Sequence, residues 1–143
     1  MPKSPNEIEQ VEALTHEQRQ DFHFSISREI YARNGVPFVK AMEGESYASI
    51  ASANNLFLRE ILKFNDLSLT TDMNARLQPG TLVYVQAKKK MAAKGIEKHV
   101  IEADDTLRGI AQRYGVSMKS ICRMNGLMTD GLIREGDIVR LRK

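Results

Sequence analysis

Few side chains in this sequence are placed to carry out chemistry. Asp104 and Asp105 are adjacent. Two neighbouring carboxylates on one loop cannot flank a glycosidic bond, because a glycosidase needs its pair about 5–9.5 Å apart across a cleft. The single cysteine, Cys122, excludes an intrachain disulfide and a cysteine-based zinc cluster. The histidines show no metal-ligand spacing; they are His16, His23 and His99. We therefore expect no catalytic residue, no bound metal and no cofactor.

Positive charge gathers in the C-terminal part of the sequence. The net charge is +3, but residues 88–143 hold thirteen basic and seven acidic residues. A basic run attracts polyanions, yet such runs are usually solvated, and no aromatic residue interleaves here to stack on nucleobases. We expect a solvated linker and no nucleic-acid partner, with polyanion attachment as an alternative. The lysines concerned are Lys88, Lys89, Lys90, Lys94 and Lys98.

Hydropathy argues against a membrane protein. The sequence holds no run of about 18 apolar residues, so no transmembrane helix is encoded. Its first residues lack the apolar core of a secretory signal. We expect no membrane insertion and no signal peptide in this chain.

An internal repeat organises most of the chain. At an offset of 60 residues, Ile50 matches Ile110, Ile61 matches Ile121, and Asn65 matches Asn125. Beyond that point the offset falls to 56, and Gly80 matches Gly136 while Val83 matches Val139. An apolar pattern that stays in step over two copies indicates a duplicated structural unit, in which the first copy has four extra residues within 68–76.

Each copy predicts a strand, two helices and a closing strand. Ser46 in the first copy and Thr106 in the second are expected to cap the start of the first helix. Asn55 and Gly115, respectively, suit a left-handed backbone conformation at the end of that helix. The predicted strands and helices of the first copy are 38–42, 47–54, 58–65 and 82–86, and those of the second are 99–102, 107–114, 117–125 and 138–142. Two helices packed on a two-stranded antiparallel sheet would give each copy a small α+β core.

Outside the repeat, the N-terminal residues predict an added helix and strand. Thr15 and Gln18 form a capping-box pattern, and residues 22–26 alternate like a strand. Asn34-Gly35 between apolar runs is a strong hairpin signal. Pro37 predicts an edge strand after that turn, and the first 15 or so residues are expected to be disordered.

The predicted organisation is therefore an α+β chain of two small βααβ units with an N-terminal extension. The extension spans residues 1–35, the first unit 36–87, a basic linker 88–95, and the second unit 96–143. The polar linker favours motion of one unit relative to the other.

The second copy resembles a LysM domain. From residue 99 it reads HVIEADDTLRGIAQRYGVSMKSICRMNGL, and from residue 132 LIREGDIVRL. The family pattern is a strand, then GDTL, then IA-x-x-YGV, then N-x-L and a glycine turn near the end. The first copy resembles it too, with VKAMEGESYASIA from residue 39, ILKFNDL from 61 and LQPGTLVYV from 77. The likeness covers residues 38–142. The tandem arrangement is similar to the C-terminal tail of bacterial cell-wall glucosaminidases.

This resemblance implies a non-catalytic module that binds peptidoglycan or N-acetylglucosamine oligomers and anchors a wall enzyme or surface protein. It implies extracytoplasmic display, and we expect a monomer. It also implies a groove between two loops of each copy. In the first, Gly44, Glu45, Ser46 and Tyr47 would face Asn74, Ala75, Arg76 and Leu77. In the second, Asp104, Asp105, Thr106 and Leu107 would face Thr129, Asp130, Gly131, Leu132 and Ile133.

The chemistry of such a groove fits a chain without tryptophan. An N-acetyl group needs a donor, an acceptor and an apolar niche, which loop backbone and a Leu or Ile side chain can provide. Asp104 stands where the family has glycine, and the first copy has a longer loop. These departures leave open an alternative, a protein–protein interaction scaffold whose sugar grooves have degenerated. They also favour the second copy as the better preserved.

Five residues have structural interpretations or weaker binding ones. Asn65 and Asn125 are expected to bond backbone at the end of the second helix, not to bind ligand. Tyr47 and, less so, Tyr84 are candidates for stacking on a sugar face. Cys122 is expected to be inert packing.

Overall fold

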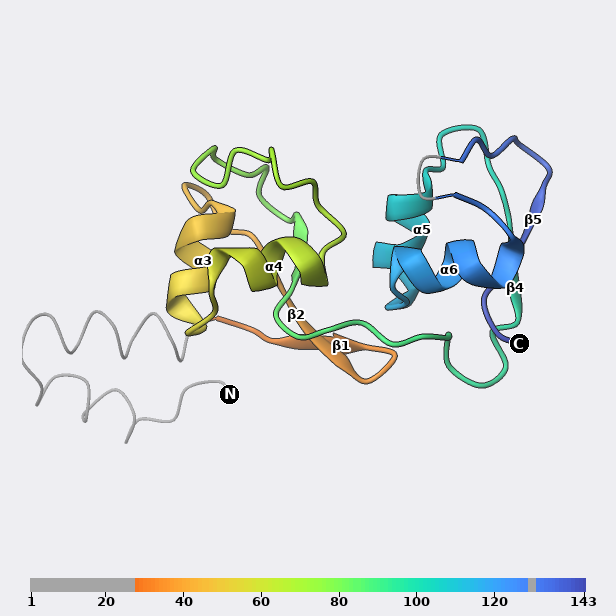
Figure 1. Ribbon diagram of the computed structural model, residues 1–143. Helices are drawn as coiled ribbons and strands as arrows, with labels where there is room; N and C mark the ends of the chain where they lie inside the picture. Colours follow the sequence, from red (N-terminus) through yellow and green to blue (C-terminus); the bar gives the residue numbers. More distant parts are fainter. Residues whose placement is uncertain (1–27, 129–130) are drawn as a thin grey trace, which may run out of the picture. The chain divides into compact units, whose positions relative to one another are not determined.

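The computed structural model describes residues 28–128 and 131–143 (Figure 1). The elements below all belong to one compact unit, residues 31–143. The predicted capping box at Thr15, the alternation over 22–26 and the predicted disorder of the first residues lie outside the described residues.

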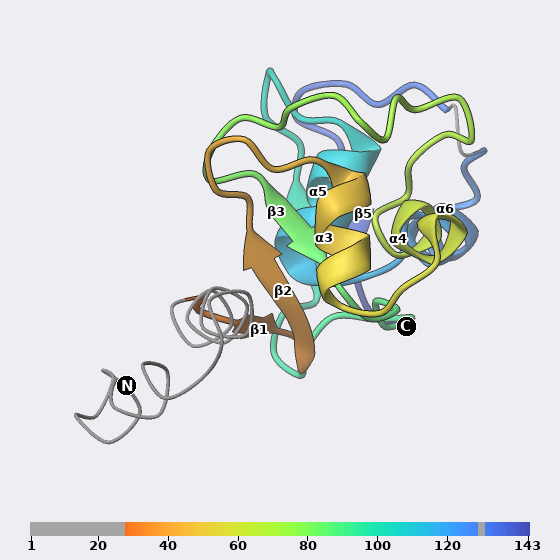
Figure 2. The ribbon, with the colours of Figure 1, turned by 90° about the vertical axis from the view of Figure 1, so that its left-hand side faces the viewer.

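The described chain is mixed α+β, as predicted. A three-stranded antiparallel sheet has the order β1-β2-β3, and β4 and β5 form a second antiparallel sheet. Figure 2 shows α3 and α4 on one side of the first sheet. The elements are β1 (Tyr31–Arg33), β2 (Val36–Lys40), α3 (Tyr47–Ala53), α4 (Leu58–Phe64), β3 (Leu82–Tyr84), β4 (Lys98–Val100), α5 (Leu107–Tyr114), α6 (Met118–Asn125) and β5 (Ile138–Arg140). We call β2-α3-α4-β3 the first βααβ unit and β4-α5-α6-β5 the second.

The added strand predicted from Asn34-Gly35 is present as β1. Both turn residues have positive φ, 56° and 75°, which the tight turn between β1 and β2 requires. The prediction that β2 is an edge strand was wrong, because β2 is the middle strand of its sheet. Pro37 is tolerated there because it lies at the end of the β2–β3 ladder, where its carbonyl still accepts from the Val85 N–H and only the bond from its own nitrogen is missing.

The predicted helix ends are confirmed. Ser46 and Thr106 accept hydrogen bonds from the backbone N–H groups of Ser49 and Gly109, which satisfies donors that a helix start leaves open. Gly115 ends α5 with φ 69°, and Asn55 follows α3 with φ 57°. Short helices of this kind are held by their caps and by packing.

The two βααβ units have separate apolar cores. Ile110, Ile121 and Val139 belong to one buried cluster, drawn entirely from residues 92–141. Ile50, Ile61 and Val83 belong to another, and no residue is shared between the two clusters. A third, small cluster lies on the other face of the first sheet and contains Val36, Phe38 and Tyr84.

Hydrogen bonds repeat between the units at the offsets found in the sequence. Ala41 N–H donates to the Thr81 carbonyl, and its own carbonyl accepts from Gly80 N–H. Ile101 makes the same two bonds with Asp137 and Gly136. These pairs hold the loop before the first helix beside the loop that enters the closing strand.

Asn65 and Asn125 have the predicted structural role. Asn65 bonds the Tyr84 N–H through Oδ1, at 2.7 Å, and the Tyr84 carbonyl through Nδ2. Asn125 makes the same two bonds with Arg140, and its Oδ1 accepts from the Arg140 backbone N–H at 2.8 Å. Each asparagine therefore clamps the end of the second helix to the closing strand of its unit.

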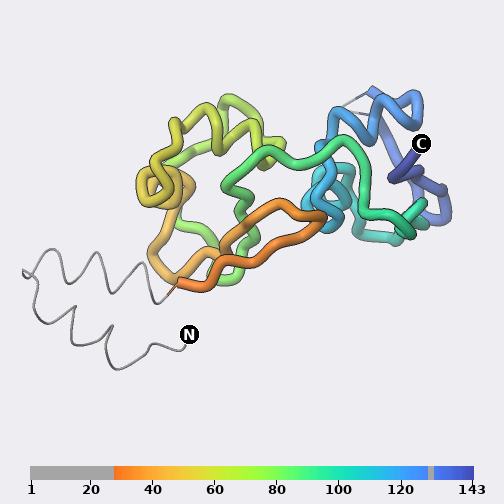
Figure 3. The backbone as a smooth tube through the Cα atoms, turned by 90° about the horizontal axis from the view of Figure 1, so that it is seen from below, coloured from red at the N-terminus to blue at the C-terminus, as the bar shows by residue number. Residues whose placement is uncertain are grey.

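The connection between β3 and β4 matches the predicted solvated linker only in part: Lys89, Lys90, Lys94 and Lys98 are exposed, whereas Lys88 is not. Figure 3 follows its path from β3 to β4. Lys88 is buried, with 1% of its side chain exposed, and forms an ion pair with Asp66. Lys89 exchanges backbone hydrogen bonds with Gly115 and Ser117. Ala92 is buried in the core of the second unit. The connection is therefore packed against α5, α6 and the end of α4.

Candidate functional site

In the first unit, the two predicted groove loops contact each other directly. Leu77 N–H donates to the Glu45 carbonyl at 2.8 Å, and Ala48 N–H donates to the Met73 carbonyl at 2.9 Å. The Glu45 carboxylate accepts from Met42 N–H and tightens the turn before α3. These bonds pair backbone N–H and carbonyl groups of the two loops with each other.

In the second unit, one of the corresponding bonds between the described loop residues is missing. Asp105 occupies the position equivalent to Glu45, and its carboxylate accepts a hydrogen bond from the Glu102 N–H at 2.8 Å. Among the described residues, however, no hydrogen bond joins Ile133 N–H to the Asp105 carbonyl, which is the counterpart of the Leu77–Glu45 bond. Thr129 and Asp130 lie outside the described residues. We call residues 103–107 and 131–137 the second-unit loops.

Three of the predicted site residues are buried beneath the loops and do not face solvent. Tyr47 and Leu107 are 7% and 6% exposed and belong to the two cores, and Glu45 is 8% exposed. The expectation that the Tyr47 ring stacks on a sugar is therefore wrong: as the first residue of α3, it points to the core. Tyr84 is also buried, and burial raises its pKa to about 12.

The remaining described site residues reach solvent. Leu132 is the most exposed apolar side chain of the second-unit loops, at 92%. Its counterpart in the first unit, by the offset of 56, is Arg76. The exposed residues are Gly44, Asn74, Ala75, Arg76, Asp104, Thr106 and Leu132, and the partly exposed ones are Ser46, Leu77, Asp105, Gly131 and Ile133.

A cavity of about 230 Å³ lies against Leu132 and Ile133. Its other walls come from the end of α6 and from β5, with Asn125 and Val139 among them. None of residues 104–107 lines this cavity. The apolar side chains of the loop therefore border a hollow on the α6 side of the second unit.

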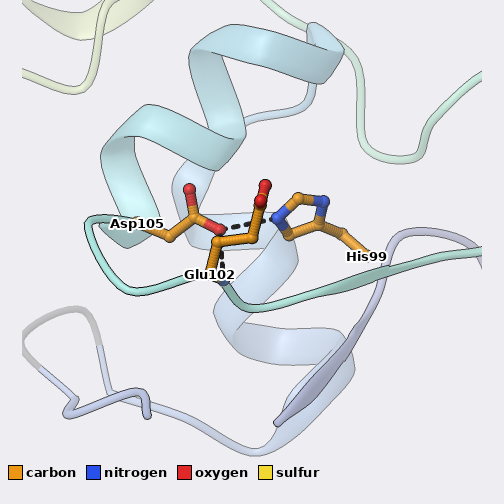
Figure 4. A group of neighbouring side chains, drawn as sticks. All are labelled: His99, Glu102 and Asp105. Atoms are coloured by element: carbon orange, nitrogen blue, oxygen red, sulfur yellow. Dashed lines mark hydrogen bonds and ion pairs between the residues drawn. The ribbon is translucent and has the colours of Figure 1, made fainter. Parts of the chain in front are cut away.

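Sequence reasoning missed a cluster that the fold assembles beside these loops. Figure 4 shows His99, Glu102 and Asp105, whose ligand atoms lie within 4.8 Å of one another. His99 Nε2 is 2.8 Å from Asp105 Oδ2, and His99 Nδ1 is 2.8 Å from the Tyr114 hydroxyl. The six-residue spacing of His99 and Asp105 across the strand-to-helix turn was the available signal.

The hydrogen bonds from His99 and from the Glu102 backbone hold the pKa of Asp105 below its usual range. One imidazole and two carboxylates are donors that suit a divalent cation. Both ring nitrogens of His99 are already engaged, so a metal bound to this histidine would have to replace one of its two hydrogen bonds. The arrangement as it stands fixes the turn that leads into α5.

Cys122 is buried, as expected, and burial raises the pKa of its thiol. Its Sγ lies 3.5 Å from the Met128 carbonyl. A buried thiol with a raised pKa is a poor nucleophile, which agrees with a packing role.

Comparison with known proteins identifies the class of the second unit. Residues 99–142 match the model of the LysM domain family. The chain is 48% identical over 46 residues to the mouse protein LysM and putative peptidoglycan-binding domain-containing protein 2, and 50% identical over 46 residues to the cattle protein of that name. Each match covers 30% of this chain and 21% of the relative. The chain therefore contains a LysM domain in residues 99–142.

Among solved structures, the spore cortex-lytic enzyme SleL of Bacillus cereus aligns with a TM-score of 0.32 and 24% sequence identity. The alignment covers 74% of this chain and 22% of that enzyme.

LysM domains are, in general, non-catalytic modules that bind peptidoglycan or chitin. Within the part of the chain that the structure describes, no helix is long and apolar enough to cross a membrane.

Proposed function

We propose that the second βααβ unit binds glycans built on N-acetylglucosamine, such as peptidoglycan, through the second-unit loops. The observation that carries the proposal is Leu132, an apolar side chain held 92% exposed in a loop that lacks, at Ile133, the counterpart of the Leu77–Glu45 bond. A leucine in this position offers a niche for the methyl group of an N-acetyl substituent. Loop N–H and carbonyl groups supply the donors and acceptors for its amide.

The first unit is, in this proposal, a second LysM-like module with a weaker site. It shares the element order, the loop-to-strand hydrogen bonds and the asparagine clamp with the LysM domain. Its loops are joined by the Leu77–Glu45 bond, and Arg76 replaces the apolar Leu132. The chain would thus be a tandem, non-catalytic and monomeric binding module, displayed outside the cytoplasm as the anchor of a wall enzyme or surface protein.

A single short groove of this kind binds weakly. Each neutral hydrogen bond contributes about 0.5–1.5 kcal/mol net, which corresponds to a Kd of about mM to μM for a few such bonds. If the first unit also engages the same polymer, effective concentration raises the apparent affinity without new contacts.

Calorimetric titration of the whole chain with N-acetylglucosamine oligomers, together with retention on purified peptidoglycan, tests this proposal. Leu132→Arg gives the second unit the residue of the first and should weaken binding about tenfold through loss of the apolar contact and the added charge. Arg76→Leu is the matched reverse exchange. Absence of binding by the unmodified chain, or an unchanged affinity in Leu132→Arg, would contradict the proposal.

The alternative function, a protein–protein scaffold, is favoured by one observation. The Leu77–Glu45 and Ala48–Met73 bonds close the loops of the first unit on themselves. A scaffold would retain its partner protein after Leu132→Arg and would give no heat with the sugar oligomers.

A further inference from the structure

A concave basic surface lies away from the second-unit loops. A cavity of about 370 Å³ is bordered by α4, the β3–β4 connection and α6, and a smaller one of about 120 Å³ adjoins it. Lys90, Ser120 and Arg123 line both. The larger volume falls in the lower part of the range of small-molecule sites, roughly 300–1,000 Å³. We call the two together the basic pocket.

The charge of the basic pocket is strongly one-sided. Four exposed cations from three separate segments converge on the larger cavity: Lys63, Lys90, Lys119 and Arg123. Asp66 is the one carboxylate side chain among its lining residues. That carboxylate already pairs with buried Lys88 and accepts the Met118 N–H, so its charge is offset within the protein.

The cations of the basic pocket differ from other cations of the second unit. Arg113 lies 4.0 Å from a Glu102 carboxylate oxygen, and Arg142 lies 3.7 Å from one of Glu97. Within residues 28–128 and 131–143, no carboxylate lies at ion-pair distance from the four pocket cations. Like charges around a hollow repel one another and create a strong positive potential inside it. Binding of an anionic ligand in the hollow would reduce this repulsion.

The lining also contains neutral donors and little stacking surface. Ser120 is buried, and its Oγ accepts from the Ser117 hydroxyl, which leaves the Ser120 hydroxyl hydrogen for another acceptor. Phe64 is the single aromatic residue lining the larger cavity, and it is only partly exposed. Lysine ammonium groups and one guanidinium suit oxyanions, whereas a nucleobase would need more aromatic faces.

We propose that the basic pocket binds a multivalent oxyanion of the phosphate class, at a site separate from the second-unit loops. The ligand is either a free phosphate compound or a phosphodiester carried on a polymer. The site uses Lys63, Lys90, Lys119 and Arg123 as charge partners and Ser120 as a neutral donor. It does not depend on sugar binding by the second-unit loops.

The test is a calorimetric titration of the whole chain at low salt with tripolyphosphate and, separately, with poly(glycerol phosphate). The double variant Lys119→Glu, Arg123→Glu should weaken binding of the bound probe at least about tenfold, because it reverses two charges beside the ligand. The matched control is Arg59→Glu, Lys94→Glu, which makes the same change in net charge at exposed residues that line neither cavity. Arg59 is also the counterpart of Lys119 in the first unit.

We expect the control pair to weaken binding less than about threefold, since screening by salt limits the effect of distant charges. Equal losses in the two double variants, or no binding of either probe by the unmodified chain, would overturn the proposal. If the charge reversal lowers the melting temperature, Lys119→Gln, Arg123→Gln serves as the second variant. Titration with a neutral N-acetylglucosamine oligomer should be unaltered in both pairs, which separates failure of this site from failure of the sugar site.

Discussion

The two βααβ units differ most where they are expected to meet a ligand. Both have the same loop-to-strand bonds, at Ala41 in the first unit and at Ile101 in the second. The first unit adds the Leu77–Glu45 bond, whereas the second leaves that pairing unmade and exposes Leu132. Among the described residues, one scaffold therefore occurs with this loop-to-loop bond in the first unit and without it in the second.

The sheets of the two units also differ. In the first, Val39 and Val83 bury one face while Phe38 and Tyr84 bury the other, and β1 adds a third strand. The second has two strands, and its outer face leaves Val100 and Ile138 53% and 56% exposed. The second unit therefore leaves apolar sheet surface exposed, whereas the first unit buries both faces of its sheet.

The largest expected effect comes from breaking the polar contacts at Lys88. Lys88 pairs with Asp66 from the first unit and donates to the Gln112 side chain from the second. Lys88→Met leaves Asp66 without its counter-charge and should lower the free energy of unfolding by about 3–5 kcal/mol. Urea denaturation measures this loss. Lys89→Met, at an exposed neighbour, is the control and should change stability little.

Lys88 also predicts a pH dependence. Burial lowers its pKa in the folded chain, so between that lowered pKa and about 10.5 the unfolded chain binds more protons. The free energy of unfolding contributed by this residue should therefore rise with pH across that window. Lys88→Met should remove the rise, and an identical pH profile in the variant would contradict the assignment.

The asparagine clamps provide the next comparison. Asn65 is fully buried and bonds Tyr84, Ile61 and Gln112, whereas Asn125 is partly exposed. Asn65→Ala should cost about 3 kcal/mol, because it leaves several buried groups unpaired, and Asn125→Ala about 1 kcal/mol. Equal losses on chemical denaturation would show that burial does not distinguish the two clamps.

A smaller effect is expected at His99, whose counterpart in the first unit is Val39. The hydrogen bond from His99 is the main cause of the lowered pKa of Asp105, so stability from this pair is present above pH 3.8 and is lost as pH falls through the lowered pKa. His99→Val should raise the pKa of Asp105, as followed by NMR titration of its carboxyl carbon. An unmoved titration would remove His99 as the cause.

Much of this fold was predictable from local signals. The apolar stripe Leu107, Ile110, Ala111 and Tyr114 between Thr106 and Gly115 predicted α5 with the bounds that the structure has. Helix caps and the Asn34-Gly35 turn depend on neighbouring residues, so sequence patterns specify them well.

Other features could not be predicted because they depend on residues far apart in the chain. The sequence around Lys88 predicts a solvated lysine run. The partners that bury Lys88, Asp66 and Gln112, lie 22 and 24 residues away in the sequence. The Leu77–Glu45 bond depends on how the longer loop of the first unit folds back. The prediction that Tyr47 stacks on a sugar was wrong because the exposure of the first residue of a helix depends on the direction of the preceding loop. Here that direction places the Tyr47 ring in the core.

NMR titration of the amide-labelled whole chain with an N-acetylglucosamine oligomer tests most directly whether the second unit is the main sugar site. We expect the largest shifts at the backbone amides of residues 103–107 and 131–135, with smaller or no shifts at residues 43–47 and 74–77. Equal shifts in both units, or shifts confined to the first, would contradict the account.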